Sequence, residues 1–203
     1  MNLINDNCIE IMKSIQSKSV DCIFTSPPFR EEDVTGDYWE FYDSWFNEAI
    51  RITKRIMFII HSSTKLNNLI LKYTPDRMLI WGKEINRCSY RYNPILCYYL
   101  DGQKWNKYIW SDAFGIPPIT PNKYKFHKYQ DPIILYETIL KMAKKGGVES
   151  VMDPFMGSGT TGVVCQNLEL DFTGIEIDEE IFNNTKKYLD LLCIDTKSQS
   201  KLF

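Results

Sequence analysis

The chain has 203 residues, of which 44% are hydrophobic and 25% charged, as in an ordinary soluble domain. This length predicts a single domain over residues 1–203 that buries a core without disulfides. Six scattered cysteines without a C-x-x-C pair, and only two histidines, argue against a metal site and favour a reducing, cytoplasmic compartment. No apolar run is long enough to span a membrane, so we expect no membrane partner. Because the net charge is −2, a nucleic acid must bind at a local basic surface.

Apolar patterns typical of strands and helices alternate along the chain. In chain order they predict a strand at 2–6, a helix at 8–17, a strand at 20–25, a helix at 39–53, a strand at 55–61, a helix at 66–72, and strands at 78–81 and 95–100. After an aperiodic ordered loop at 101–130 they predict a helix at 131–144, a strand at 149–153, a helix at 160–168, a strand at 172–177 and a helix at 179–192. This order predicts an α/β fold with a mostly parallel seven-stranded sheet and helices on both faces.

The expected strands end at polar, proline-rich or glycine-rich positions. These positions are Asp6, Ser26–Phe29, His61–Ser63, Asp153–Gly159 and Glu176–Asp178. Ligands of parallel sheets bind beyond the carboxyl ends of the strands, so we expect one shared cleft there. His61 either lines that cleft or is a satisfied strand end, and the second interpretation is favoured.

A glycine-rich turn follows one expected strand and opens a helix, at Asp153–Thr161. Its glycines permit a sharp turn close to a ligand, and the first helical amides offer an anion site. Glu176, which lies 23 residues after Asp153, is placed to accept both hydroxyls of a ribose. The pattern favours a nucleoside cofactor. The alternative is that the glycines serve helix–strand packing and Glu176 caps the next helix.

The turn departs from the dinucleotide fingerprint G-x-G-x-x-G. A carboxylate-bearing cofactor such as S-adenosylmethionine suits it as well. In that interpretation Asp153 pairs with the amino group of the cofactor, and the amides around Gly157–Gly159 hold its carboxylate.

Several motifs together resemble the DNA amino-methyltransferases, the family that methylates N4 of cytosine or N6 of adenine. The turn Asp153–Thr161 resembles the cofactor motif of that family, and Ser26–Phe29 resembles its catalytic motif [D/N/S]-P-P-[Y/F/W]. The catalytic motif comes first, as in the circularly permuted beta group. The resemblance implies a circularly permuted, Rossmann-like fold of S-adenosylmethionine-dependent methyltransferases. It is compatible with a homodimer and with a cognate restriction nuclease, neither of which the sequence specifies.

The resemblance also assigns cofactor-binding residues. They are Asp6, Asp153, Pro154, Phe155, Gly157, Ser158, Gly159, Thr160, Thr161, Glu176, Asp178, Asp131 and Pro132. Asp6 reaches the adenosine end of the cofactor or caps the following helix. At Asp131-Pro132 the family commonly has lysine and proline, so this contact departs from the pattern.

The expected catalytic residues are Ser26, Pro27, Pro28 and Phe29. The Ser26 hydroxyl and the Pro27 carbonyl accept hydrogen bonds from an exocyclic amine, which localises its lone pair for attack on the methyl group, and the prolines hold that carbonyl in place. Phe29 stacks on the base, which must be flipped out of a duplex.

Cytosine and adenine present the same donor and acceptor edge, so the motif serves both bases. In the resembling family, serine at the first motif position is associated mostly with N4-cytosine enzymes, and we therefore favour cytosine. N6 of adenine is the alternative. A catalytically inactive cofactor- and nucleic-acid-binding subunit, or an RNA substrate, also remains open.

Residues 83–128 carry eight basic residues against three acidic ones, interleaved with aromatic side chains. Basic residues bind phosphates and aromatic rings stack on bases, so this segment is predicted to contact DNA. Residues 101–130, which overlap this segment, are the candidate target recognition element. The predicted DNA-binding residues are Lys83, Arg87, Arg91, Lys104, Lys107, Lys123, Lys125 and Lys128.

Overall fold

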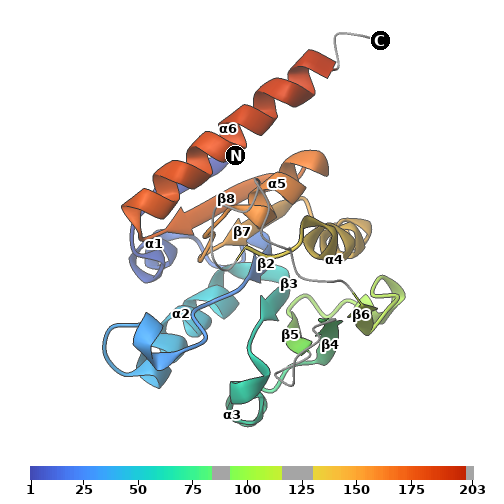
Figure 1. Cartoon of the computed structure of the whole chain (residues 1–203). Coiled ribbons are helices and arrows are strands. Elements are labelled where there is room, and N and C mark those ends of the chain that lie inside the picture. The colour runs from blue at the N-terminus through green and yellow to red at the C-terminus, as the bar shows by residue number, and fades with distance from the viewer. Residues whose placement is uncertain (84–91, 116–129, 200–203) are drawn as a thin grey trace.

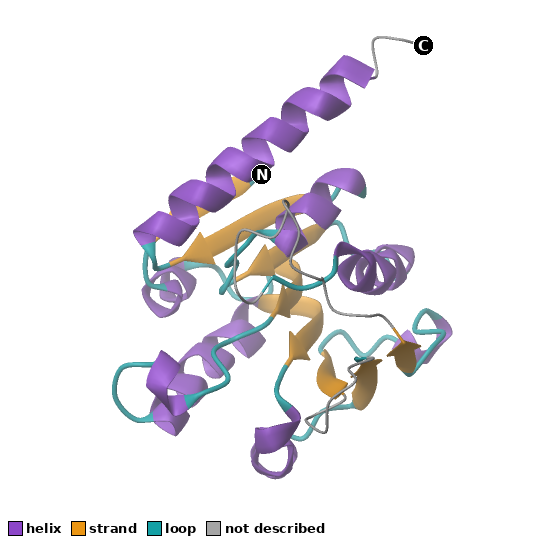
Figure 2. Ribbon diagram, in the orientation of Figure 1, coloured by secondary structure: helices purple, strands orange, loops and turns teal. Residues whose placement is uncertain are grey.

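The computed structural model describes the backbone of residues 1–83, 92–115 and 130–199, and the side chains of these residues up to Leu191. One eight-stranded sheet lies between two layers of helices (Figure 1, Figure 2). Its strands are β1 (Asn2–Asn5), β2 (Val20–Thr25), β3 (Thr53–Ile60), β4 (Arg77–Gly82), β5 (Tyr92–Tyr99), β6 (Ala113–Gly115), β7 (Ser150–Asp153) and β8 (Asp171–Glu176). The helices are α1 (Cys8–Ser14), α2 (Tyr38–Ile52), α3 (Leu66–Lys72), α4 (Ile133–Lys145), α5 (Thr160–Asn167) and α6 (Glu179–Gln199).

The strand order across the sheet is β1-β8-β7-β2-β3-β5-β4-β6. β5 runs antiparallel to its neighbours β3 and β4, and the other neighbouring pairs are parallel. The predicted α/β class with a mostly parallel sheet is therefore confirmed. The sheet has eight strands instead of the expected seven because β6, inside the expected loop 101–130, pairs with β4. Three residues are too few to show an alternating pattern.

Alternating side chains of the central strands fill two separate cores. Cys22 and Phe24 of β2 face α4 and α5, whereas Ile23 between them faces α1 and α2. The second core is built around the rings of Tyr42 and Trp45 from α2, both fully buried. Burial on both faces explains the near-continuous apolar runs of these strands.

The last turns of α6 extend past the rest of the molecule, near the C-terminal end of the chain in Figure 1. Among the described helices, none has a stretch long and apolar enough to cross a bilayer.

The start of α2 is fixed by a side-chain cap. Asp37 accepts hydrogen bonds from the backbone N–H groups of Trp39 and Glu40, at 2.8 and 2.9 Å. Such a cap satisfies amides that have no partner within the helix. It places Tyr38 at the first position of α2, where its side chain faces the end of β3.

A buried carboxylate joins the starts of β2 and β7. Asp21, 8% exposed, accepts from the backbone N–H groups of Glu149 and Ser150 and lies 3.4 Å from Arg55 and 3.6 Å from Lys54. Burial alone would raise the pKa of Asp21, but these donors and cations hold it below the ordinary value. The ionised form is therefore part of the native structure.

We expect Asp21→Asn to lower the free energy of unfolding by about 1–2 kcal/mol at pH 7, because it removes a charged hydrogen-bond acceptor. A carboxyl whose pKa is lowered by folding stabilises above its unfolded pKa and loses this effect as pH falls through the folded one. The difference between the two proteins should therefore shrink below about pH 4, as measured by urea unfolding. A constant difference down to pH 3 would contradict this role.

Candidate functional site

Two distant segments meet where β2 and β7 end. Cys22 and Ile23 of β2 pair with Val151 and Met152 of β7, so the following residues emerge side by side. The Thr25 hydroxyl donates a 2.7 Å hydrogen bond to Oδ1 of Asp153. The proline-containing loop Ser26–Phe29 and the glycine-rich turn Asp153–Thr161 thus lie at the same edge of the sheet.

Asp153 is buried at this junction and is 3% exposed. Its carboxylate also accepts from the Thr161 hydroxyl and, at 3.1 Å, from the Phe155 backbone N–H. Burial raises its pKa to about 6, although these three donors oppose the shift. A carboxylate accepts about four hydrogen bonds, so the three from described residues leave capacity for one more donor.

The turn owes its shape to two glycines. Gly157 and Gly159 have φ angles of 48° and 74°, in the left-handed region where side chains are strained. A Cβ atom at Gly159 would lie 2.6 Å from the side chain of Thr185 on α6. The Thr185 hydroxyl donates to the Gly157 carbonyl at 2.6 Å, so α6 also holds the turn in place by a hydrogen bond.

Glu176 joins the end of β8 to this turn. Its two carboxylate oxygens accept from the backbone N–H groups of Gly157, at 3.0 Å, and Asp178, at 2.9 Å. Burial raises the pKa of Glu176, against these backbone donors. The alternative that Glu176 caps the next helix is wrong, because Asp178 does so by accepting from Ile181 N–H at 2.9 Å.

Asp6 lies beside this carboxylate on the neighbouring strand end. Its backbone N–H donates to the Glu176 carbonyl at 3.2 Å, and its exposed side chain accepts from the Asn7 N–H at 2.7 Å. The cap of α1 is Asn7, which accepts from Ile9 N–H at 2.9 Å. The capping role considered for Asp6 therefore belongs to its neighbour.

The other predicted cofactor residues of the turn differ in where their side chains lie. Pro154, Ser158, Thr160 and Thr161 are buried within it. The Phe155 ring packs against Trp45, with ring centroids 5.4 Å apart, so this residue contributes its side chain to the α2 core. The sequence motif alone does not separate such packing from ligand contact.

Asp131 and Pro132 are held against the turn just before α4. The Tyr136 hydroxyl donates to the Asp131 carboxylate at 3.0 Å, and the Thr160 hydroxyl donates to the Asp131 carbonyl at 3.4 Å. Lys83, at the end of β4, is half-buried with its ammonium 4.3 Å from the Trp81 ring centroid. Burial lowers the pKa of Lys83, and the negative charge of Asp131 opposes this shift.

The expected catalytic loop is anchored by a residue that the sequence analysis missed. The Tyr38 hydroxyl donates to the Pro28 carbonyl at 3.0 Å and lies 3.0 Å from Nε2 of His61. The half-buried Phe29 ring packs on the His61 ring, with centroids 4.8 Å apart. His61 ends its strand with its hydrogen bonds made, which is the interpretation favoured from the sequence. Its ring also packs against Phe29. The sequence does contain one sign of Tyr38: it is an aromatic residue directly after Asp37, a residue type that caps helices.

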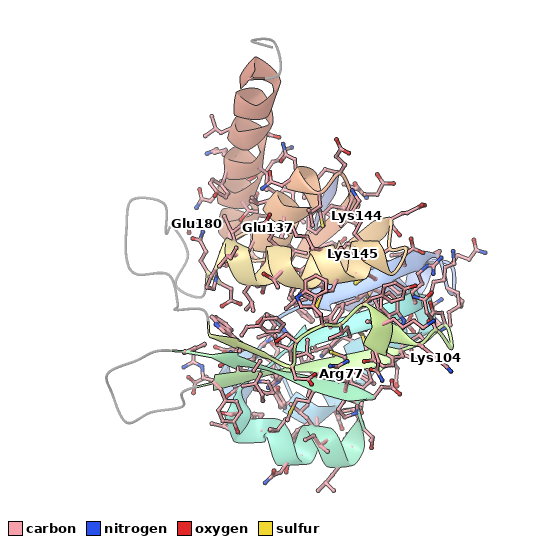
Figure 3. All side chains as sticks on the ribbon, turned by 90° about the vertical axis from the view of Figure 1, so that its right-hand side faces the viewer. Arg77, Lys104, Glu137, Lys144, Lys145 and Glu180 are labelled. Atoms are coloured by element: carbon pink, nitrogen blue, oxygen red, sulfur yellow. The ribbon has the colours of Figure 1, made fainter. Side chains whose placement is uncertain are left out.

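The predicted DNA-binding residues are divided by the fold. Lys83 lies at the same edge as the two loops, whereas Arg87, Arg91, Lys123, Lys125 and Lys128 lie outside the described residues. Lys104 and Lys107 follow β5, which runs in the opposite direction, and therefore lie at the far edge of the sheet. Figure 3 shows Lys104 at that edge. Gln103 beside them donates to Gly146 after the last turn of α4, at 3.0 Å. That Lys104 and Lys107 contact DNA stays a prediction, and such a contact would lie away from the edge that carries the two loops.

Most described residues of the candidate recognition element are exposed, but two of its aromatic rings belong to the core. Trp105 is fully buried and Phe114 is 8% exposed, so neither ring can stack on a base. Trp110 is 54% exposed, with the Lys145 ammonium 4.9 Å from its ring centroid. Residues 116–129 of the element, including His127, lie outside the described residues. Within the described residues, no group of three or more His, Cys, Asp or Glu side chains is placed to hold a metal ion.

We expect Asp153→Asn to raise the free energy of unfolding of the cofactor-free protein by about 1–3 kcal/mol at pH 8. A carboxyl whose pKa is raised by folding loses its stabilising effect as pH rises through the folded value, here about 6. The asparagine does not ionise, so the gain should fall to about half at pH 5, which lies between the unfolded pKa near 4 and the folded one. Urea unfolding at both pH values measures this, with Asp171→Asn at the far edge as control. Equal stability of Asp153→Asn and the original chain at pH 8 would refute the buried-charge argument.

Comparison with known proteins places the chain in a family. A family model described as DNA methylase matches residues 20–187. The chain is 25% identical over 262 residues to the type II methyltransferase M.BamHI of Bacillus amyloliquefaciens, covering 99% of this chain and 61% of that relative. The chain thus spans about three fifths of the length of this relative.

Two solved structures share the fold. The PvuII DNA methyltransferase (cytosine-N4-specific) superposes with a TM-score of 0.73 at 16% identity, covering 92% of this chain and 86% of that one. A complex of M1.HpyAVI with S-adenosylmethionine gives 0.67 at 24% identity, covering 93% and 98%. These likenesses confirm the predicted fold class, and the family match confirms the resemblance drawn from the motifs. The chain belongs to the DNA methylase family.

Proposed function

We propose that this protein transfers a methyl group from S-adenosylmethionine to the exocyclic amine of a DNA base held outside the duplex. The observation that carries this proposal is the buried Thr25–Asp153 hydrogen bond. It joins the loop expected to hold the base to the turn expected to hold the cofactor. A methyl group must pass directly between two bound molecules, so holding both at one edge supplies the proximity that the reaction needs.

The residues of the turn fit S-adenosylmethionine. The Glu176 carboxylate, at the carboxyl end of β8, is the group to accept the ribose hydroxyls. The turn Gly157–Gly159 presents the N-terminal end of α5 to a carboxylate. Asp153 retains capacity for one further donor, which suits the amino group of the cofactor. The complex of M1.HpyAVI with S-adenosylmethionine supports this assignment.

Bound S-adenosylmethionine supplies an electrophilic methyl group on a sulfonium. The chain supplies the position of the nucleophile. The half-buried Ser26 hydroxyl and the Pro27 carbonyl accept the amine hydrogens and direct its lone pair towards the methyl group. The N–C bond forms as the S–C bond breaks, and the methylated amine then releases its proton to solvent. Phe29, supported by His61, stacks on the base.

We favour N4 of cytosine over N6 of adenine, because Ser26 occupies the first motif position. The PvuII enzyme, whose title gives N4 of cytosine, has the same fold and supports this choice. Adenine methylation is the second candidate. DNA as the partner follows from the family, while a homodimer and a cognate restriction nuclease stay predictions.

Mass spectrometry of nucleosides tests the proposal after incubation of the protein with S-adenosylmethionine and mixed-sequence DNA. We expect N4-methylcytosine, and N6-methyladenine would instead support the second candidate. No methylated nucleoside from DNA, with the cofactor bound, would favour the inactive binding subunit. Parallel incubation with RNA tests that substrate directly.

Substitutions in the loop test its assigned roles. Phe29→Ala should lower kcat/KM by about 10–100-fold, the cost of one lost base stack. Ser26→Ala should lower kcat by roughly 10-fold or more while the Kd for S-adenosylmethionine stays unchanged, because the hydroxyl acts on the amine. Steady-state kinetics with labelled cofactor measure both effects. Unchanged turnover in both variants would show that this loop does not hold the base.

Cofactor affinity should depend on pH through Asp153. Since the pKa of Asp153 is about 6, its negative charge is lost below that pH and no longer attracts the amino group. The Kd for S-adenosylmethionine should rise by up to about tenfold per pH unit below pH 6. Calorimetry between pH 5 and 7.5 measures this rise.

Two variants identify the titrating group. Asp153→Asn should abolish the pH dependence below pH 6. Glu176→Gln, which leaves Asp153 in place, should weaken binding and keep a dependence with a slightly lower midpoint, because the Glu176 charge contributes to the raised pKa of Asp153. A Kd that does not change over this range in the original protein would contradict the assignment of Asp153.

A further inference from the structure

We propose that Tyr38 and His61 form a hydrogen-bond relay that sets the direction of the Pro28 carbonyl and so positions the loop Ser26–Phe29. Both are positioning residues for the methyl transfer proposed above, on which this inference rests. Neither belongs to the two motifs: Tyr38 opens α2, and His61 follows β3.

The relay begins at the sheet, which fixes His61. The His61 backbone N–H donates to the Pro94 carbonyl of β5 at 3.0 Å. The Ser62 backbone N–H donates to Nδ1 of His61 at 2.8 Å. A backbone N–H can only donate, so Nδ1 accepts, and the neutral ring carries its proton on Nε2. Burial lowers the pKa of His61 to about 4, which keeps this neutral form at physiological pH.

The direction of each bond then follows. Nε2–H of His61 donates to the Tyr38 hydroxyl oxygen, 3.0 Å away, and the Tyr38 O–H donates to the Pro28 carbonyl, also at 3.0 Å. Burial raises the pKa of Tyr38, so its hydroxyl keeps the proton that it donates. The ring is held in place by the Lys65 ammonium, 4.3 Å from its centroid, and Lys65 pairs with Glu31 at 2.8 Å.

The loop needs such an anchor because of its composition. Proline fixes φ at Pro27 and Pro28, which leaves the ψ angles as the main backbone freedom there. The ψ angle of Pro28 determines the direction of the Pro28 carbonyl. The hydrogen bond from Tyr38 to that carbonyl therefore fixes this angle. This angle sets the position of the Phe29 ring, which follows it. The Pro27 carbonyl depends on ψ of Pro27, and that angle is restricted because β2 holds the chain before it and the bond from Tyr38 holds the chain after it. The His61 ring that starts the relay also supports Phe29, at 4.8 Å.

The chain contains a matched control in the same helix. Tyr42 lies one turn after Tyr38, is fully buried and contacts the same histidine, with ring centroids 5.8 Å apart. Its hydroxyl has no hydrogen-bond partner among the described residues. Tyr38→Phe and Tyr42→Phe therefore remove the same atom from neighbouring buried rings, but only the first breaks the relay.

Kinetics of the two variants test the relay. Tyr38→Phe should lower kcat by about 5–20-fold, with the KM for DNA and the Kd for S-adenosylmethionine within about twofold of the original values. Tyr42→Phe should leave all three unchanged. Original kcat in Tyr38→Phe, in a protein that Ser26→Ala inactivates, would overturn the relay and leave the proposed function intact.

Two amide substitutions at His61 separate its two nitrogens. Glutamine reaches the position of Nε2 and can still donate to Tyr38, whereas asparagine reaches only that of Nδ1. His61→Gln should therefore retain more kcat than His61→Asn at equal thermal stability. Equal losses in the two variants would show that packing, and not donation to Tyr38, is what His61 provides.

Hydrogen exchange gives a readout that does not depend on activity. In Tyr38→Phe the amides of the peptide that spans residues 26–34 should exchange faster than in the original protein, because the loop is released. In Tyr42→Phe they should exchange at the original rate. Unchanged exchange in Tyr38→Phe would overturn the relay, even if the protein transferred no methyl group to DNA.

Discussion

The arrangement of the site depends on one buried hydrogen bond between neighbouring strands, from the Thr25 hydroxyl to the Asp153 carboxylate. In a buried environment such a bond is stronger than in water, and leaving either group unpaired is costly. The bond therefore holds the ends of β2 and β7 in one relative position. One proposed binding loop begins directly after Thr25 and the other at Asp153, so their separation is set by the sheet and not by the loops themselves.

The two cores make this sheet edge rigid. The aromatic core around Tyr42 and Trp45 holds α2, and through it Tyr38, against the end of β3. The other core holds α4 and α5 against the same strands, with Tyr136 stacked on Phe24 at 4.4 Å. Asp131, Thr160 and the glycine turn are connected to this core of α4 and α5. Each core thus supports one proposed loop, and the sheet between them keeps the loops in register.

Much of this could be predicted from the sequence because it follows from local pattern and parallel topology. Parallel strands bring their carboxyl ends to one edge, so Ser26, Asp153 and Glu176 were correctly expected to be neighbours. Local ambiguity explains the smaller errors: Asp6 and Asn7 are both good capping residues, and only the geometry shows that Asn7 caps α1. Tyr38 was missed because its role depends on where α2 docks. The position of Lys104 and Lys107 at the opposite edge could not be predicted, because an apolar run such as β5 does not reveal in which direction the strand runs.

The reversal of β5 also brings the start of one strand to an edge otherwise made of strand ends. Gly82 pairs with both Tyr92 and Gly115 at this edge of the sheet, where β4 and β6 end and β5 begins. The Tyr92 ring is 36% exposed there and belongs to neither buried core. Substitutions of this ring can therefore alter the surface beside the proposed site without disturbing the packing that supports both loops.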